Sequence, residues 1–276
     1  MYDIFQIDRL IDLWLTEDIG TCDLTAQLMI DEDAKSTFHM NAREPMVIAG
    51  IDVAARLFAR YDPTLTVTRL ARDGERVEKG ARILTVSGPA RSILTAERPA
   101  LNILQRLCGI ATETARFNAE LAGTGARLID TRKTTPGLRM LEKHAVSCGG
   151  GLNHRLGLDN GVMLKDNHIA VAGSIAGAVE RVRQKLPVLT KIEVECDRLE
   201  QVEEALAARA DVIMLDNMSI EDMTTAVKLV NGRAKIEASG GIRIDTIRNV
   251  ALTGVDYIST SKITQAAPAV DIGLDE

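Results

Sequence analysis

Residues 191–217 read KIEVECDRLEQVEEALAARADVIMLDN, and this stretch carries the pattern that decides the fold. The runs 191–195 and 211–215 are short strand candidates, and the second of them is mainly apolar. Residues 197–209, between them, are rich in Ala and Leu and predict a helix. A strand, a helix and a second strand joined by short links predict two parallel strands with the helix packed outside them.

The same alternation extends in both directions along the chain. Strand candidates lie at 127–131, 162–165, 191–195, 211–215, 235–238 and 256–259, and helical stretches at 170–186, 197–209, 219–230 and 243–253. Because the unit recurs over roughly 150 residues, we expect a barrel of parallel strands rather than a single open sheet.

The N-terminal part of the chain has a different texture. Between about residues 35 and 94, strand-like runs alternate with glycine turns around a helical run at 52–60. A longer apolar stripe at helical spacing runs from Leu101 to Ala115, with Thr95 as its cap and Pro99 in its first turn. We expect an α/β domain over 1–105 and a barrel domain over 106–276, with the extreme C-terminus able to pack back on the first domain.

Composition excludes several classes of protein. The chain has 276 residues, 46% of them hydrophobic, and a net charge of −6. A nucleic-acid binder usually has a basic balance, and this chain has few aromatic residues (Trp 1, Tyr 3, Phe 4) on which bases could stack. No run approaches the ~18 apolar residues of a membrane span. We therefore expect a globular protein without nucleic-acid or membrane partners.

The cysteines and the first residues bear on the cellular compartment. Cys22, Cys108, Cys148 and Cys196 are far apart and form no CxxC pair, which favours buried, reduced thiols over a disulfide framework or a zinc site. The start, MYDIFQIDRLIDLWL, lacks the basic and then apolar layout of a signal peptide. We expect a cytoplasmic protein.

Polar residues follow almost every strand candidate of the predicted barrel. The groups in question are Thr131-Arg132-Lys133, Lys165-Asp166-Asn167-His168, Glu195, Asp216-Asn217, Ser239-Gly240-Gly241 and Ser259-Thr260-Ser261. In a barrel of parallel strands these carboxyl ends converge on one rim, which is the face that carries active sites. One polar strand end is merely the start of a solvated loop, but six in succession predict a functional rim.

The charges at this rim suit small anionic ligands. Residues 98–168 hold ten Lys or Arg against six Asp or Glu, a local charge of +4 in an acidic chain. Within a glycine-dense stretch that we expect to be site loops lie the cations Arg132, Lys133, Arg139, His154, Arg155 and Lys165. Guanidinium and ammonium groups in such a cluster bind carboxylates and phosphates.

The remaining strand ends add two further kinds of chemistry. The sequences ASGG and STS place small residues and hydroxyls ahead of helices, where backbone N–H groups can hold a phosphate. Glu195 and Asp216 put two carboxylates on neighbouring strand ends. They could bind a divalent cation, hold ribose hydroxyls, or stabilise a developing positive charge.

Residues 131–169, TRKTTPGLRMLEKHAVSCGGGLNHRLGLDNGVMLKDNHI, resemble the signature of the nicotinate-nucleotide pyrophosphorylase (quinolinate phosphoribosyltransferase) family. The likeness extends in order through LTEDIGTCDLT, AERPALNILQRLCGIAT, IEVEC, IMLDN, EASGG and GVDYIS. It implies an N-terminal α/β sandwich domain followed by an incomplete, seven-stranded α/β barrel, of which the sequence shows six strands. It also implies a homodimer or a higher oligomer.

The resemblance implies a reaction as well. Family members transfer a phosphoribosyl group from 5-phosphoribosyl 1-pyrophosphate (PRPP) to quinolinate with Mg²⁺ and no organic cofactor, and release pyrophosphate and CO₂. They are pentosyltransferases, and their product is nicotinate mononucleotide for NAD synthesis.

By the same resemblance, the family's site residues map onto this sequence. Arg132, His154 and Arg155 would bind quinolinate, together with Arg98 from the neighbouring subunit. Lys133 and Lys165 would meet the phosphates, and Glu195 and Asp216 the ribose and Mg²⁺. The loop for the 5′-phosphate would consist of Ser239, Gly240 and Gly241. The substrate site would be completed by Thr131, Ser259, Thr260 and Ser261.

Two positions depart from the family's pattern. Ser261 and Gln265 stand where family members often carry a glycine and then a histidine, which affects the last phosphate contact. Cys22 stands where a glycine is common.

Three other functions remain open from the sequence. One is a Schiff-base aldolase that uses Lys165 on a barrel strand. The second is a relative associated with molybdenum transport that shares the TRKT and GGG-HR patterns, although the intact 164–168 segment favours the transferase. The third is a non-catalytic module that binds a phosphoribosyl group or a dicarboxylate.

Overall fold

The computed structural model describes residues 3–276, which form two compact units. Unit 1 comprises the described residues up to Ala115 together with Thr135–Gly150 and Ala266–Glu276, and unit 2 comprises Arg116–Thr134 and Gly151–Gln265. The two units are thus interleaved along the chain, and the division of the domains at about residue 105 stays a prediction.

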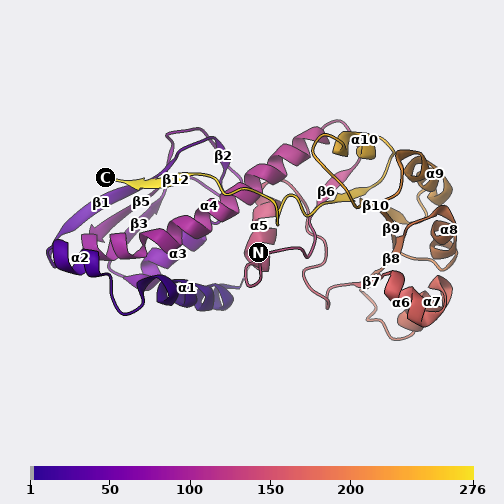
Figure 1. Cartoon of the computed structure of the whole chain (residues 1–276), viewed down its shortest axis with the longest axis horizontal. Helices are drawn as coiled ribbons and strands as arrows, with labels where there is room; N and C mark the ends of the chain where they lie inside the picture. Colours follow the sequence, from indigo (N-terminus) through magenta and orange to yellow (C-terminus); the bar gives the residue numbers. More distant parts are fainter. Residues whose placement is uncertain (1–2) are drawn as a thin grey trace. The chain divides into compact units, whose positions relative to one another are not determined.

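Unit 1 contains a four-stranded antiparallel sheet (Figure 1). Its order is β12 (Ile272–Asp275), β1 (Lys35–Ala42), β5 (Arg82–Pro89) and β3 (Thr66–Arg69), and β2 (Met46–Val47) pairs separately with β4 (Arg76–Val77). The C-terminal strand β12 joins the sheet beside β1, where Met40 faces Leu274. The last residues of the chain therefore belong to the first sheet.

The helices of unit 1 pack through an apolar layer and ion pairs. They are α1 (Ile4–Ile19), α2 (Leu24–Met29), α3 (Ile51–Tyr61), the first part of α4 (Ala90–Glu120) and α5 (Arg139–Cys148). α1 buries Ile7 and Ile11 and contacts α3, where Arg60 binds Asp12 through two hydrogen bonds of 2.8 and 2.9 Å.

The long helix α4 begins earlier than the sequence predicts. It starts at Ala90, so Pro99 lies inside the helix rather than in its first turn. The expected cap was wrong because the Thr95 hydroxyl is used elsewhere: it donates a hydrogen bond to Asp23 Oδ2 at 3.0 Å.

Unit 2 contains a six-stranded parallel sheet. Its order is β6 (Arg127–Ile129), β11 (Tyr257–Ser259), β10 (Lys235–Ser239), β9 (Val212–Asp216), β8 (Ile192–Cys196) and β7 (Val162–Leu164). On the free side of β6, Leu152 forms an isolated parallel bridge with Ile129. The described residues thus form six strands of an incomplete barrel, with a single bridge beside the first.

Helices cover the outer face of this parallel sheet (Figure 1). They are α6 (Asp166–Ala172), α7 (Ile175–Arg183), α8 (Leu199–Ala207), α9 (Ile220–Val230) and α10 (Ile247–Ala251). The helical stretch predicted at 170–186 is in fact two helices, because α6 ends at Gly173 and Ser174 caps α7 by accepting the Gly177 N–H. No helix within residues 3–276 combines the length and apolarity needed to cross a membrane.

Candidate active site

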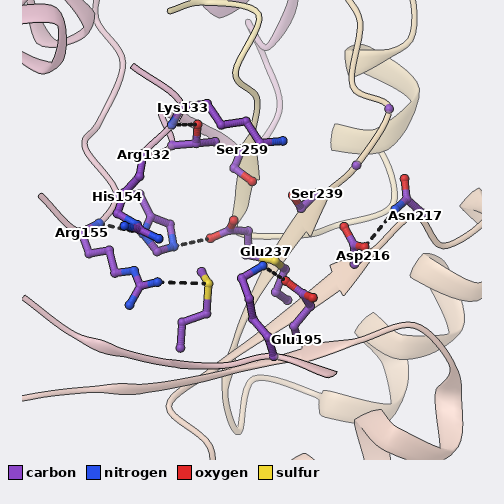
Figure 2. Close-up of a pocket in the computed structure, with 16 residues that line it drawn as sticks. Arg132, Lys133, His154, Arg155, Glu195, Asp216, Asn217, Glu237, Ser239 and Ser259 are labelled. Carbon is purple, nitrogen blue, oxygen red and sulfur yellow. Dashed lines mark hydrogen bonds and ion pairs between the residues drawn. The ribbon is translucent and has the colours of Figure 1, made fainter. Parts of the chain in front are cut away.

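A pocket of unit 2 lies at the carboxyl ends of its strands (Figure 2). Its cavity has a volume of about 600 Å³. The lining residues are Thr131, Arg132, Lys133, His154, Arg155, Met163, Lys165, Glu195, Met214, Asp216, Asn217, Glu237, Ser239, Gly240, Gly241 and Ser259. This is the position at which parallel α/β folds bind their ligands.

Strand alternation decides which side chains enter the pocket. Along β8, Ile192 and Val194 are fully buried toward the helices, whereas Glu195 lines the pocket. The same period of two places Met214 and Asp216 of β9 inside. Because Ser239 pairs in register with Asp216, and Glu195 with Met214, neighbouring strand ends present their polar groups side by side.

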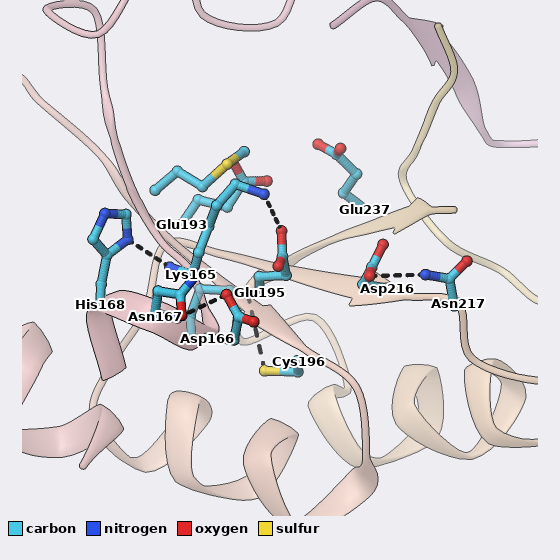
Figure 3. Close-up of polar contacts among 12 residues, drawn as sticks. Lys165, Asp166, Asn167, His168, Glu193, Glu195, Cys196, Asp216, Asn217 and Glu237 are labelled. Carbon is cyan, nitrogen blue, oxygen red and sulfur yellow. Dashed lines mark hydrogen bonds and ion pairs between the residues drawn. The ribbon is translucent and has the colours of Figure 1, made fainter. Parts of the chain in front are cut away.

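Lys165 and Glu195 form an ion pair in this pocket (Figure 3). The Lys165 Nζ donates to Glu195 Oε2 at 2.6 Å, with the lysine side chain 44% exposed and the glutamate 17%. The Lys165 main-chain N–H donates to His168 Nδ1 at 3.0 Å, which fixes the residue at the start of α6. The ammonium is thus oriented by its carboxylate partner and remains open to a ligand.

His154 rests on two buried carboxylates. Its Nε2 lies 2.9 Å from Glu193 and 3.4 Å from Glu237. Burial alone would lower the pKa of His154, but hydrogen bonds to Glu193 and Glu237 outweigh it and raise the pKa to about 10. On the other side of the ring, the Arg155 N–H lies 2.7 Å from Nδ1, a contact that favours the neutral ring. Two buried carboxylates favour the charged ring by more, so we assign an imidazolium.

Two guanidinium groups lie close to this histidine. Arg155 donates to the Gly161 carbonyl at 3.2 Å and to the Met163 sulfur at 3.7 Å. Burial and the nearby charge of Arg132 lower the pKa of Arg155. Like charges held together in a partly buried site are relieved by a bound anion, so this corner of the pocket suits a carboxylate or a phosphate.

A second cavity of about 310 Å³ adjoins the loops after β10 and β11. Its lining residues are Thr131, Lys133, Ser239, Gly240, Gly241, Ile242, Arg243, Ser259, Thr260, Ser261 and Lys262. Gly240 has φ +86°, and a Cβ there would clash with Asn217, including its main-chain nitrogen at 2.9 Å. A glycine is therefore required where this loop turns, and the loop leaves room for an anion at its backbone.

The structure brings together most of the residues that the sequence singled out. All of the residues between 131 and 259 that the family resemblance assigned to the site line the first pocket, and Thr260 and Ser261 line the second cavity. Arg98 lies on α4 in unit 1 and is absent from both lining sets. The expectation that Arg139 lies in a site loop was wrong, because it is the first residue of helix α5 in unit 1.

Sequence reasoning missed two acidic residues that contact His154, of which Glu237 lines the pocket and Glu193 does not. Glu193 and Glu237 are 6% and 1% exposed and contact His154 from β8 and β10. Each lies two positions before a predicted site residue, Glu195 or Ser239, and therefore on the same face of its strand. Strand alternation was the signal that could have found them.

The carboxylates of Glu195 and Asp216 suit a magnesium ion that arrives with a phosphate ligand. Both are oxygen donors, the ligands that Mg²⁺ prefers. Within residues 3–276, neither belongs to a group of three or more His, Cys, Asp or Glu side chains at ligand distance from one another. One or two carboxylates plus substrate phosphates is the usual arrangement for Mg²⁺, so the donor set fits the ion without an all-protein cage.

Comparison with known proteins identifies the family. A family model described as the N-terminal domain of quinolinate phosphoribosyl transferase matches residues 23–108, and one described as its C-terminal domain matches 110–275. The chain is 45% identical over 271 residues to a probable nicotinate-nucleotide pyrophosphorylase of a Synechocystis strain, covering 97% of this chain and 92% of that protein. It is 42% identical over 270 residues to a similarly named protein of Bacillus subtilis, covering 98% and 93%.

Solved structures give the same result. The nicotinate-nucleotide pyrophosphorylase of Francisella tularensis is similar to this chain with a TM-score of 0.94 and 41% identity, covering 100% of this chain and 97% of that one. The NadC structure from Streptococcus pyogenes has a TM-score of 0.96 and 40% identity, covering 100% and 98%. The chain belongs to the quinolinate phosphoribosyltransferase family.

Proposed function

We propose that this chain catalyses decarboxylating phosphoribosyl transfer from PRPP to quinolinate, giving nicotinate mononucleotide, pyrophosphate and CO₂. The observation that carries the proposal is the charge arrangement of one cavity of about 600 Å³. Arg132, His154 and Arg155 gather at one end of it, whereas Asp216 lies at the other (Figure 2). A dicarboxylate and a phosphorylated sugar need these two environments in one site.

The cationic end of the pocket suits quinolinate, whose two carboxylates lie on adjacent ring carbons. Arg132 and Arg155 supply guanidinium forks, and the charged ring of His154 supplies a third donor. Because the chain has few aromatic residues, the pyridine ring is held through its carboxylates rather than by stacking.

PRPP occupies the other end of the pocket and the adjoining loops. Lys133 and Lys165 meet the phosphates of the pyrophosphate group, and the backbone of residues 239–241 holds the 5′-phosphate. The lining of both cavities by Lys133 and by residues 239–241 supports this assignment, because it makes one continuous path for a doubly phosphorylated sugar.

The transfer step forms one bond and breaks one. The quinolinate nitrogen attacks C1′ of the ribose as the C1′–oxygen bond to pyrophosphate breaks, and positive charge develops on the ribose. Glu195 and Asp216 stabilise that charge electrostatically, and Lys165, held 2.6 Å from Glu195, neutralises the departing pyrophosphate. Loss of CO₂ leaves its electron pair on the adjacent ring carbon, where the positively charged nitrogen stabilises it, and a proton from solvent then adds to that carbon.

Glu195 and Asp216 would also hold Mg²⁺, which supplies further neutralisation of pyrophosphate charge when bound with PRPP. This assignment rests on the all-oxygen donor set at the two strand ends.

The active enzyme is a homodimer in this proposal, with Arg98 of one subunit completing the quinolinate site of its neighbour. The resemblance of the segment AERPALNILQRLCGIAT to the family supports the assignment of Arg98.

The ion pair of Lys165 argues against an aldolase. A Schiff-base lysine must offer a free amine to a carbonyl, whereas Lys165 donates to Glu195 at 2.6 Å. Borohydride with a carbonyl substrate should therefore trap nothing on this residue.

The first test is direct. The protein is incubated with quinolinate labelled in the 2-carboxylate, PRPP and Mg²⁺, and labelled CO₂, pyrophosphate and nicotinate mononucleotide are measured. Lys165→Ala should lower kcat/KM by about 10²–10³-fold because it removes a charge from the transition state. Lys185→Ala, which changes an exposed lysine outside the lining residues, should leave activity unchanged. A folded wild-type protein that binds quinolinate but forms no product would refute the proposal.

A further inference from the structure

A second cluster of metal-ligand side chains lies in unit 1, and the proposed reaction uses none of its members. Asp73 lies in the turn between β3 and β4, and His144 and Cys148 lie on α5. One ligand atom from each residue, a carboxylate oxygen, an imidazole nitrogen and the thiol sulfur, lies within 4.8 Å of the other two. Within residues 3–276, the other such group is the His154, Glu193 and Glu237 set already described.

The distance between the sulfur and the nitrogen matches that of a tetrahedral zinc site. Cys148 Sγ lies 3.5 Å from His144 Nε2. Zinc bonds of about 2.3 Å to sulfur and 2.0 Å to nitrogen at a tetrahedral angle separate the two ligand atoms by about 3.5 Å. Asp73 Oδ2 lies 2.6 Å from His144 Nε2, as a direct hydrogen bond requires. A metal ion replacing that proton would need these two atoms about 0.7 Å further apart, which side-chain rotation can supply.

The three side chains are held in place by their backbone. His144 and Cys148 are four residues apart on one helix, so they project from the same face. Asp73 Oδ1 accepts the Ile51 N–H at 3.1 Å, which leaves Oδ2 directed at the histidine. The adjacent Gly74 N–H donates to the Ile48 carbonyl at 2.8 Å, which anchors the turn. A metal-ligating carboxylate typically has such a supporting hydrogen bond.

The cluster is not arranged as a catalytic dyad. A histidine that activates a thiol uses one ring nitrogen for the sulfur and the other for the carboxylate, whereas here Nε2 faces both. This geometry does not match a histidine-activated thiol, whereas a metal ion is a partner that all three donors can share.

We propose that Asp73, His144 and Cys148 form a zinc-binding site in unit 1, with water as the fourth ligand. One sulfur, one nitrogen and one oxygen donor match Zn²⁺, whereas the all-oxygen pair Glu195 and Asp216 matches Mg²⁺. Binding releases the thiol proton and the proton between Nε2 and the carboxylate to solvent.

The surroundings of the cluster allow a metal ion to enter and determine what its binding does to unit 1. The side chains of Asp73 and His144 are 20% and 21% exposed, so a small ion can reach them. Asp73 also lines an open cavity of about 360 Å³ with the acidic residues Asp52 and Glu75. A bound ion ties α5 to the turn before β4 and stabilises unit 1, because it binds the folded state and not the unfolded chain.

The test uses Co²⁺ as a spectroscopic substitute for Zn²⁺ on the full chain after treatment with a chelator. Co²⁺ bound through Cys148 should give a thiolate-to-cobalt charge-transfer absorption in the near ultraviolet, and Zn²⁺ should displace it. Cys148→Ser should abolish this absorption, and His144→Gln should weaken Co²⁺ binding by at least about tenfold. Cys22→Ser, which changes a cysteine outside the cluster, should leave the spectrum unchanged.

Folding of each variant is checked by far-ultraviolet circular dichroism, and the Tm is measured with and without Zn²⁺. Zn²⁺ should raise the Tm of the wild-type protein and not that of Cys148→Ser. A folded wild-type protein without the charge-transfer absorption overturns the proposal, as does an absorption that survives in folded Cys148→Ser. The spectrum needs no substrate, so this outcome is independent of the transferase assay.

Discussion

His154 shows how a single side chain in the pocket obtains its charge. Glu193 and Glu237 are nearly or fully buried and contact the ring at Nε2, so they raise the pKa of His154 to about 10 and favour a charged ring at neutral pH. The Asp130 carboxylate accepts the His154 N–H at 2.8 Å and the Asn153 side-chain amide at 2.7 Å, which fixes the backbone from which the ring projects. A dicarboxylate therefore meets a cation whose position and charge are both set in advance.

This arrangement predicts a pH dependence of stability. The pKa of His154 is about 10 in the folded protein against 6.5 for a free histidine. Because the folded value is raised, the stabilisation is fully present below pH 6.5 and is lost as the pH rises through about 10. His154→Gln should flatten the fall in unfolding free energy between those pH values, as measured by urea denaturation.

His39 provides the control for this experiment. It lies on β1 in unit 1, where its Nδ1 lies 2.9 Å from the Thr85 hydroxyl, and His39→Gln measures the effect of losing a histidine outside the pocket. An identical slope in wild-type protein and His154→Gln would contradict the assignment of an imidazolium.

At the scale of elements, the strands of unit 2 place two different chemistries on their two faces. Ile213 and Leu215 of β9 are fully buried, while Met214 and Asp216 line the pocket. One short strand therefore supplies both the core and the site, because successive side chains point to opposite faces. The loops that follow the strands then need only a few residues to complete the phosphate contacts.

The loop after β10 supports a prediction at this scale. Gly240→Ala should raise the KM for PRPP at least about tenfold, because the new Cβ meets Asn217 and the loop that holds the 5′-phosphate must shift. KM is measured by initial rates with PRPP varied at saturating quinolinate.

Gly232→Ala is the matched control. Gly232 also has a positive φ, +73°, but a Cβ there has no neighbour within 4 Å. Both variants should lose about 1 kcal/mol of unfolding free energy to backbone strain, yet only Gly240→Ala should affect KM. Equal KM values for the two variants would show that the loop does not bind PRPP.

At the scale of the whole molecule, the proposed dimer makes a prediction about mixtures of inactive subunits. Arg98→Ala and Lys165→Ala should each be inactive alone. If Arg98 acts in the neighbouring subunit's pocket, a hybrid dimer has one pocket with both defects and one with neither. Mixing under subunit exchange should then restore up to about a quarter of wild-type activity.

The control mixture combines Lys165→Ala with Glu195→Gln. Both of these residues line the same pocket, so every pocket of the hybrid carries one defect and no activity should return. Recovery in neither mixture would contradict the cross-subunit role of Arg98.

Local sequence patterns predicted the positions of the strands and the rim. The six strand candidates of the barrel all correspond to strands of unit 2, because apolar runs between polar ends are a local signal. The helix that begins at Arg139 was missed, since this helix, α5, buries the polar residues Glu142 and Lys143 and so hides its apolar face. Burial of Glu142 is stabilised by Arg106 at 3.0 Å, a partner 36 residues away.

The sequence by itself determined the family, the alternation of strands and helices and the residues at the strand ends, because each of these is encoded in neighbouring positions. Only the tertiary structure decided that Glu193 and Glu237 charge His154, and that Asp73 reaches His144 across 71 positions. Such pairs depend on how elements distant in the sequence pack, and no periodicity along the chain records them. The charge of His154 in the pocket and the proposed zinc site in unit 1 both arise from this tertiary packing.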